Sequence, residues 1–340
     1  MKTWEHKQLA LAQNPKRWLI TGVAGFIGSH ILEKLLQLNQ EVIGIDNFAT
    51  GFKRNLAEVR KKVTLNQWER FQFIDADIEN HRTMIECFKL KPDLVLHQAA
   101  LGSVPRSLIE PLITHSVNTS GFLNILDLAR QNAVQRFVYA SSSAVYGDCT
   151  RQPAIESEIG TALSPYAVSK HINELYAKLY TQCYGLDTVG LRYFNVVGPR
   201  QDPDGAYAAV IPKWIDSLLK EREVFINGDG STSRDFCPVR NIVQANILAA
   251  ITPTNTHNGR VFNVALGQQT SLIDLYKKLA QLVNSTRQPT FRAFRQGDIQ
   301  YSCANTELIR AQLHFTPEQT LADSLVETVA WYKSQAHTVI

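Results

Sequence analysis

Short apolar runs alternate with amphipathic stretches through the first half of the chain. Apolar runs of this length are typical of buried strands, and helix-length segments between them indicate strand–helix–strand units around a parallel sheet. The predicted strands of this half are Trp18–Thr21, Glu41–Asp46, Phe71–Asp77, Asp93–Ala99, Arg136–Ser141 and Thr188–Asn195.

The spacing of the predicted helices and strands changes after Gly198. Helical patterns and short strands now follow one another, at Val210–Lys220, Val224–Asn227, Asn241–Ala250, Val261–Val264 and Ser271–Val283. We expect an α/β protein with a doubly wound parallel sheet and a smaller C-terminal α/β lobe that binds substrate. Residues 1–16 would be an extension, 17–198 a nucleotide domain with later segments threaded back onto it, and 199–340 mainly the lobe. No Pro/Gly/Ser linker separates the two parts, so the ligand site is expected in a crevice between them.

The composition of the chain disfavours some classes of function. The 340 residues are 44% hydrophobic and 19% charged, with a net charge of +4 and no Lys/Arg block interleaved with aromatics, which disfavours nucleic acid as a partner. The sequence has no signal-peptide core and no apolar run of membrane length, so we expect a cytoplasmic protein without membrane insertion. The cysteines are scattered without ligand spacing, which predicts reduced thiols and no metal: Cys87, Cys149, Cys183, Cys237 and Cys303.

A glycine-rich turn follows the first strand and opens a helix, with the sequence GVAGFIG over residues 22–28. Glycines at such a turn let the backbone approach a pyrophosphate, whose charge is favoured at a helix N-terminus. Glycines also serve ordinary turns, but the strand–loop–helix context favours a dinucleotide. The expected contacts are Gly22, Gly25, Phe26, Ile27 and Gly28.

Asp46 ends the second strand, where a carboxylate accepts hydrogen bonds from the adenosine ribose and repels a 2′-phosphate. This predicts NAD rather than NADP, with Asn47 beside it. Asp46 as a helix cap is the alternative. Asp77 and Ile78 end the third strand and are expected to border the adenine, although a strand-end aspartate is common without any ligand.

Tyr166 and Lys170 lie four residues apart, on one face of a predicted helix. A neighbouring ammonium lowers the pKa of a phenol from about 10, which makes the tyrosine a usable proton acceptor. The pair alone is a frequent accident on solvated helices. Ser141–Ser143 at a strand end make chance a poor explanation, because a hydroxyl there can hydrogen-bond an oxygen that exchanges a proton.

The glycine loop, the segment SSSAVYG over residues 141–147 and the Tyr166/Lys170 pair resemble the extended short-chain dehydrogenase/reductases, specifically their nucleotide-sugar branch. The resemblance runs from about Arg17 to Tyr332 and implies a Rossmann fold. It implies that Tyr166 is the acid/base, that Lys170 also binds the nicotinamide ribose, and that Ser142 and Ser143 contact the sugar.

The same resemblance implies further cofactor contacts at Gln98, Ala99, Ala100, Asn118 and Tyr193. For Gln98 and Asn118, a buried polar group satisfied by the backbone is the alternative. Residues 228–236 and 295–298 resemble segments that bind the UDP diphosphate and ribose. The implied substrate contacts are Gly102, Ser103, Tyr166, Asn195, Ala209, Val210, Lys213, Trp214, Asn227, Arg234, Arg295, Asp298 and Ser302, with Trp214 as plain core the alternative.

Dehydratases and decarboxylases of this branch carry acidic residues just after the catalytic serine, where this chain has Ala144 and Val145. The resemblance therefore implies C4 epimerisation through a transient 4-keto sugar and enzyme-bound NADH. The resemblance places Ser302 where hexose-specific epimerases tend to carry a bulky tyrosine, which implies room for a 2-acetamido group; a solvent-facing serine is the alternative. The chain thus resembles the UDP-N-acetylglucosamine 4-epimerases of bacterial surface-polysaccharide (O-antigen) synthesis, which also accept uronic acids.

Two long helices predicted over Pro111–Asn132 and Pro165–Tyr184 match those through which the family forms homodimers with a four-helix bundle. Other readings stay open: a UDP-glucose/UDP-galactose 4-epimerase, a net dehydrogenase, reductase or dehydratase, and a catalytically silent nucleotide-binding regulator.

Overall fold

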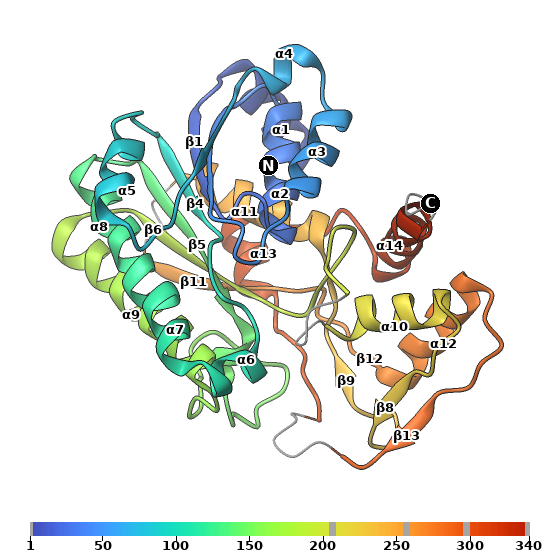
Figure 1. Cartoon of the computed structure of the whole chain (residues 1–340). Coiled ribbons are helices and arrows are strands. Elements are labelled where there is room, and N and C mark those ends of the chain that lie inside the picture. Colours follow the sequence, from blue (N-terminus) through green and yellow to red (C-terminus); the bar gives the residue numbers. More distant parts are fainter. Residues whose placement is uncertain (1–2, 204–208, 254–258, 295–299, 337–340) are drawn as a thin grey trace.

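The computed structural model describes residues 3–203, 209–253, 259–294 and 300–336. Its centre is a seven-stranded sheet in the order β11-β6-β5-β4-β1-β2-β3, and every strand pair in it is parallel (Figure 1). The strands are β1 Arg17–Thr21, β2 Glu41–Asp46, β3 Phe71–Asp75, β4 Leu94–His97, β5 Arg136–Ser142, β6 Thr188–Tyr193 and β11 Arg260–Val264. This order confirms the predicted doubly wound sheet of the Rossmann type.

Helices cover both faces of the sheet, and each face has its own apolar core. One face packs against α1 Trp4–Gln13, α2 Phe26–Gln37, α3 Lys53–Lys62, α11 Val239–Ile251 and α13 Glu307–Leu313. The other packs against α5 His81–Phe88, α8 Phe122–Gln131 and α9 Pro165–Tyr184. Because α11 and β11 come late in the chain yet join the sheet, the segment after residue 199 does not form the lobe alone.

The smaller lobe has a separate core in which Ile215, Leu275 and Leu325 are almost completely buried. It lies below and beside the sheet in Figure 1. Its elements are α10 Val210–Leu219, β8 Phe225–Asn227, β9 Ser233–Arg234, β12 Thr270–Ser271, α12 Leu272–Val283, β13 Thr290–Arg292 and α14 Leu321–Ala336. Short strands β7 Val196–Val197 and β10 Cys237–Pro238 pair where the chain passes between the two parts.

Strands β3, β4 and β6 each stop two residues earlier than predicted, and one predicted helix is divided. β3 stops at Asp75 rather than Asp77, because the Asp77 side chain accepts the Glu79 backbone N–H at 2.8 Å and turns the chain. The predicted helix over 111–132 is α7 Pro111–His115, a π-helical segment Ser116–Gly121 and then α8. The remaining short elements are α4 Leu65–Trp68, α6 Val104–Ile109 and the 3₁₀ turn Ser143–Tyr146.

No helix in the described part of the chain combines the length and the apolar character that crossing a bilayer requires.

Candidate active site between two clefts

The glycine loop leads from β1 directly into α2. Gly22 has φ +70°, and a Cβ there would lie 2.8 Å from the Ala99 backbone nitrogen. A Cβ at Gly28 would overlap the carbonyl oxygen of Gly22, so α2 can pack on the loop only with glycine at this position. Gly25 caps α2 without a side-chain hydrogen bond. The N-terminal end of the helix dipole is therefore open toward an anion.

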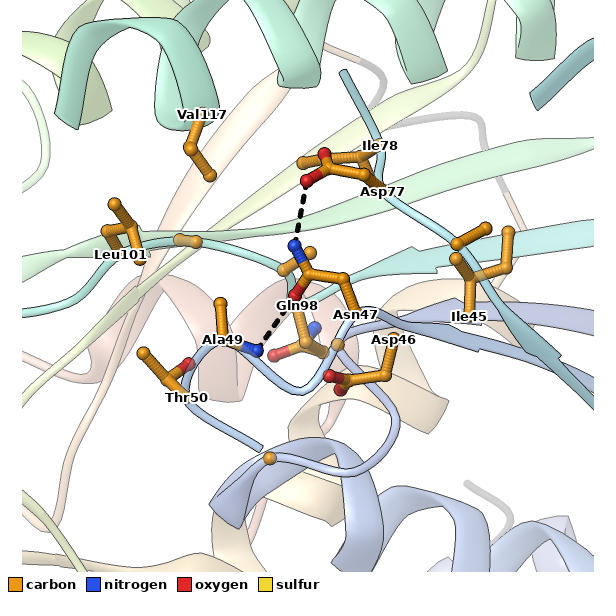
Figure 2. A pocket seen from close by; sticks show the side chains of 15 residues that line it. Ile45, Asp46, Asn47, Ala49, Thr50, Asp77, Ile78, Gln98, Leu101 and Val117 are labelled. Atoms are coloured by element: carbon orange, nitrogen blue, oxygen red, sulfur yellow. Dashed lines mark hydrogen bonds between the residues drawn. The ribbon is translucent and has the colours of Figure 1, made fainter. Parts of the chain in front are cut away.

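The ends of β2, β3 and β4 line a cleft above this loop, with about 570 Å³ of empty space (Figure 2). Asp46 is 7% exposed, and its carboxylate accepts the N–H groups of Ala24 and Phe48 at 2.8 Å each. Burial raises the pKa of Asp46, and these two hydrogen bonds oppose the shift. A carboxylate has about four acceptor positions, so Asp46 retains capacity for ligand hydroxyls.

Asn47 directly follows β2 and links the end of that strand to the segment just after β3. Its amide nitrogen donates to an oxygen of Asp77 at 2.8 Å, and its amide oxygen accepts the Ala49 N–H at 3.0 Å (Figure 2). The structure thus brings together in one cleft these predicted cofactor residues: Gly22, Gly25, Asp46, Asn47, Asp77, Ile78, Gln98, Ala99 and Ala100.

Asn118 lies in the π-helical segment and is not among the residues that line this cleft. Its side chain pairs with both backbone groups of Leu101, accepting its N–H at 2.7 Å and donating to its carbonyl at 3.0 Å. It also donates to Ser169 at 3.2 Å. In this structure Asn118 is therefore satisfied by protein groups, and it ties the cleft wall to α9.

Tyr166, Lys170 and Ser142 come together where the end of β5 meets the first turns of α9. Ser142 hydrogen-bonds the Tyr166 phenol, and its Oγ also accepts the Ala144 N–H at 3.1 Å. Lys170 is buried, with its ammonium 2.9 Å from the Ala140 carbonyl and 5.9 Å from the centre of the Tyr166 ring. The three side chains that the sequence analysis named together thus lie in one cluster.

The expected effect of Lys170 on the pKa of the phenol stays a prediction. Burial raises the pKa of Tyr166, and the hydrogen bond from Ser142 opposes the shift only in part. The ammonium donates to a backbone carbonyl instead of the phenol, while burial lowers the pKa of Lys170 to about 8.

A buried ion pair that the sequence analysis did not identify supports this cluster. Glu174 lies one turn beyond Lys170 on α9 and binds Arg192 of β6 through two hydrogen bonds, at 2.9 and 2.8 Å. Ser141, next to Ser142, donates to the same carboxylate at 2.5 Å. The pair fixes the end of β5 against α9, and so sets the distance between Ser142 and Tyr166.

A second cleft, with about 1470 Å³ of empty space, opens between the loop at the start of α2 and the smaller lobe. Its lining includes these predicted residues: Phe26, Ile27, Asn195, Ala209, Val210, Asn227 and Arg234. Gly22 and Gly25 line the first cleft, whereas Phe26 and Ile27 line the second. The two clefts therefore adjoin at the N-terminus of α2.

Other predicted substrate residues lie elsewhere. Trp214 is buried in the lobe core, edge-on to Tyr276. It is therefore a core residue, which was the alternative interpretation of this position. Lys213 is exposed and is not among the lining residues. Ser302 is half-buried and is not among the lining residues, and its N–H donates to the Ser233 carbonyl at 3.2 Å. Arg295 and Asp298 lie outside the described residues.

Gly102 and Ser103 precede α6. Gly102 is exposed, and Ser103 has φ +98°, an uncommon value for a residue with a side chain. The Ser103 Oγ accepts the Arg106 N–H at 3.3 Å and caps α6. Strained backbone of this kind clusters at ligand sites, and the contact of Ser103 with substrate stays a prediction.

Comparison with known proteins decides the family. The model of the NAD dependent epimerase/dehydratase family matches residues 18–265. The chain belongs to this family. A putative UDP-glucose 4-epimerase of Methanocaldococcus jannaschii is 34% identical over 94% of this chain and 99% of its own length.

Solved structures of the epimerase/dehydratase family are similar over nearly the whole chain. The UDP-N-acetylglucosamine 4-epimerase of Methanobrevibacter ruminantium, in complex with UDP-N-acetylmuramic acid, superposes with a TM-score of 0.87 at 38% identity. That match covers 94% of this chain and 99% of the other. The Bacillus cereus UDP-glucuronic acid 4-epimerase, in complex with UDP-glucuronic acid and NAD, gives 0.84 at 27% identity, with coverage of 94% and 99%.

The cofactor of the epimerase/dehydratase family fits the first cleft. The open N-terminus of α2 and the glycine positions suit a pyrophosphate, and Asp46 at the end of β2 suits ribose hydroxyls. Within the epimerase/dehydratase fold, Asp46, Asn47 and Asp77 would hold the adenosine end, and Lys170 the nicotinamide ribose.

Several lining residues were not predicted. They are Ile45, Ala49, Thr50, Ala76, Leu101 and Val117 in the first cleft, and Val196, Gln201, Ile211, Thr232, Phe236, Leu272, Phe294 and Gln300 in the second. Most are small or apolar and carry no pattern of their own. Asn246 lines neither cleft and was also not predicted, although an asparagine in the apolar stretch of α11 is a visible signal of a buried polar contact.

Proposed function

We propose that this protein catalyses reversible 4-epimerisation of a UDP-sugar, with UDP-N-acetylglucosamine and UDP-N-acetylgalactosamine as the preferred pair and the corresponding uronic acids as further substrates. The single observation that carries the proposal is the Tyr166–Ser142–Lys170 cluster, in a chain whose glycine loop and α2 N-terminus also border two clefts. The glycine loop and the strand ends that line one cleft suit a dinucleotide, and the residues of the lobe that line the other suit a second nucleotide with its sugar.

The roles of the side chains follow from their positions. Bound NAD would accept the hydrogen of C4 with its electron pair and return it to the opposite face of the sugar. Tyr166 takes the proton of the O4 hydroxyl and later gives it back, while Ser142 holds the same oxygen by a hydrogen bond. Lys170 binds the ribose beside them. Between the two transfers the 4-keto sugar rotates in the second cleft and presents its other face. Because the hydrogen is returned to the sugar, no net oxidation results.

Elimination chemistry lacks its usual catalyst here. Ala144 and Val145 stand where dehydratases of this branch carry acidic side chains, and Val145 is buried in an apolar cluster. Neither side chain can exchange a proton with C5 or O6 of a bound sugar. This favours epimerisation over loss of water.

Contacts to the UDP part are proposed for Asn195, Asn227 and Arg234 in the second cleft. The Arg234 guanidinium is half-buried and is held by the carbonyls of Ser233 and Gln300 at 2.9 and 3.4 Å. A guanidinium fixed in this way suits a diphosphate. Arg295 and Asp298 remain predicted partners from the sequence.

The N-acetylhexosamine preference depends on Ser302, which is small and lies on the segment that continues from Gln300. A UDP-glucose 4-epimerase is the alternative, since relatives of both kinds are similar to this chain. Purified protein should be incubated with each UDP-sugar and the products resolved. Conversion of UDP-N-acetylglucosamine without stoichiometric absorbance at about 340 nm, the band of free reduced nicotinamide, is the expected result. Release of reduced cofactor would indicate a dehydrogenase, and absence of any turnover a silent binding protein.

The protein is also proposed to form a homodimer through α7, α8 and α9. Large apolar side chains on α6, α7 and α9 are exposed, with exposed fractions of 83% for Leu112, 68% for Ile109 and 57% for Leu175. Contiguous exposed apolar surface of this kind marks an interaction site. The two helical segments of a second copy would cover it in a four-helix bundle.

Light scattering at micromolar concentration tests the dimer. We expect a dimer for the parent and a monomer for Leu112→Asp, because a carboxylate cannot be buried unpaired in an apolar interface. Leu65→Asp on α4 is the matched control, since Leu65 is 57% exposed far along the sheet from α7, and it should remain dimeric. A monomeric parent would contradict the proposal.

A further inference from the structure

α11 is buried along almost its whole length between the sheet and α2, yet it carries the asparagine Asn246 at 0% exposure. Its carboxamide oxygen accepts the Gln98 amide at 3.0 Å, and its nitrogen donates to the Tyr193 hydroxyl at 2.8 Å. The Tyr193 hydroxyl lies 3.1 Å from the Gln98 carboxamide oxygen. Three side chains from β4, β6 and α11 thus meet below the first cleft.

These contacts close a cycle. Gln98 donates to Asn246, Asn246 donates to Tyr193 and to the Ile242 carbonyl, and the Tyr193 hydroxyl lies 3.1 Å from the carboxamide oxygens of both Gln98 and Asn246. Burial raises the pKa of Tyr193, which keeps its hydroxyl neutral and able both to donate and to accept. Hydrogen bonds in such a chain polarise and strengthen one another.

The cycle controls a surface that faces the cofactor. Gln98 lines the first cleft, and its labelled side chain lies among the cleft residues in Figure 2. Its backbone nitrogen donates to Thr21 at 3.1 Å, so the start of its side chain is held beside the glycine loop. Only the carboxamide can still rotate, about the last bonds of the side chain. Its contacts with Asn246 and Tyr193 fix the directions in which its oxygen and its nitrogen point.

We propose that Asn246 is a positioning residue for NAD: it fixes the orientation of the Gln98 carboxamide in the cofactor cleft without touching the cofactor. The proposal rests on the NAD dependence of the family and is independent of which sugar is bound. A residue from the segment after residue 199 then acts, through Gln98, on a cleft whose lining lies within residues 22–117.

The chain offers a matched control on the same helix. Asn241 is also fully buried, and its carboxamide also bonds at both ends, donating to the Gln319 carbonyl at 2.8 Å and accepting the Glu318 and Gln319 N–H groups at 3.0 Å each. These partners precede α14 and lie outside the cleft lining. Asn241→Ala and Asn246→Ala therefore remove comparable buried contacts with different consequences for the cofactor.

The test measures the NAD dissociation constant of cofactor-depleted protein by titration calorimetry, with no sugar present, beside the thermal unfolding of each variant. We expect Asn246→Ala to weaken NAD binding about tenfold, the size of one to two lost hydrogen bonds. Asn241→Ala should bind NAD as the parent does, despite a similar loss of thermal stability. If both variants bind NAD equally well, or lose affinity equally, Asn246 has no positioning role.

A double-mutant comparison separates positioning from a general loss of packing. Because Asn246 acts through Gln98, Gln98→Ala with Asn246→Ala should bind NAD no more weakly than Gln98→Ala alone. Tyr193→Phe leaves the direct Gln98–Asn246 contact and should cost less than Asn246→Ala. Additive losses in the double variant would overturn the proposal. Failure of the sugar proposal would change none of these results, since only NAD binding is measured.

Discussion

The two clefts are built in different ways. The cofactor cleft draws its lining from residues 22–117, at the consecutive ends of β1, β2, β3 and β4. The second cleft takes residues scattered from Phe26 to Gln300, mostly from loops and short strands of the lobe. The first is fixed by the sheet itself, because parallel strands place their carboxyl ends along one edge. The second depends on how separate loops pack, so it can change its ligand without changing the fold.

This difference predicts two classes of variant. Changes beside the cofactor cleft should affect every substrate equally, because they act on chemistry that all share. Changes beside the second cleft should alter the choice between substrates. The variants below test that division.

The largest effect is expected for Tyr166→Phe, which deletes one hydroxyl. We expect turnover to fall by about 10²–10⁴-fold, the usual contribution of a general acid/base. The loss should be the same for UDP-N-acetylglucosamine and UDP-glucose, while NAD content remains that of the parent. Steady-state rates with both sugars check this. A rate within a few-fold of the parent would remove Tyr166 from its proposed role.

Lys170→Met should weaken both cofactor retention and rate, since one ammonium serves the ribose and the site. The loss of a charged hydrogen bond predicts about 10–100-fold weaker NAD binding. Acid release of nucleotide from the purified variant, followed by chromatography, measures retention. Normal NAD content with a normal rate would place Lys170 outside the site.

Ser302→Tyr tests the other cleft. An added ring beside C2 is expected to cost UDP-N-acetylglucosamine about tenfold or more in kcat/KM, because packed sites tolerate little extra volume. UDP-glucose should be retained or improved, since a C2 hydroxyl needs less room. Equal loss with both substrates would mean that the residue acts on folding or on the cofactor. No change with either would place Ser302 outside the pocket.

The smallest effect is a pH dependence of cofactor binding. Burial lowers the pKa of Lys170 to about 8, so the ammonium that binds the ribose is present below that pH and is lost above it. The affinity of cofactor-depleted protein for NAD should fall about fourfold from pH 7 to 8.5, following the protonated fraction of one such group. In Lys170→Met the same titration should be flat. An affinity that rises with pH would contradict this assignment.

The sequence predicted the cofactor side more completely than the sugar side, and the reason is physical. Asp46, Asp77 and Gln98 follow recognisable buried strands, and strand order then places them together. Trp214 was assigned to the sugar pocket from resemblance, but an aromatic residue on an amphipathic helix packs as well into the lobe core, where it lies.

Contacts between distant segments could not be predicted. The Glu174–Arg192 pair joins α9 to β6, and nothing in the local pattern of either residue announces the other. The same holds for Asn246 with Gln98, which are separated by 148 positions. The raised pKa of Tyr166 was missed because burial depends on the finished fold.

Transfer of the C4 hydrogen within the site is the central claim, and conversion in deuterated water tests it most directly. Purified protein without added cofactor is mixed with UDP-N-acetylglucosamine in D₂O, and the product is examined by proton magnetic resonance. We predict UDP-N-acetylgalactosamine that retains its hydrogen at C4, because the hydrogen leaves and returns without meeting solvent. Deuterium at C4 would contradict this course, as would deuterium at C5 with loss of water, or the absence of the C4 epimer.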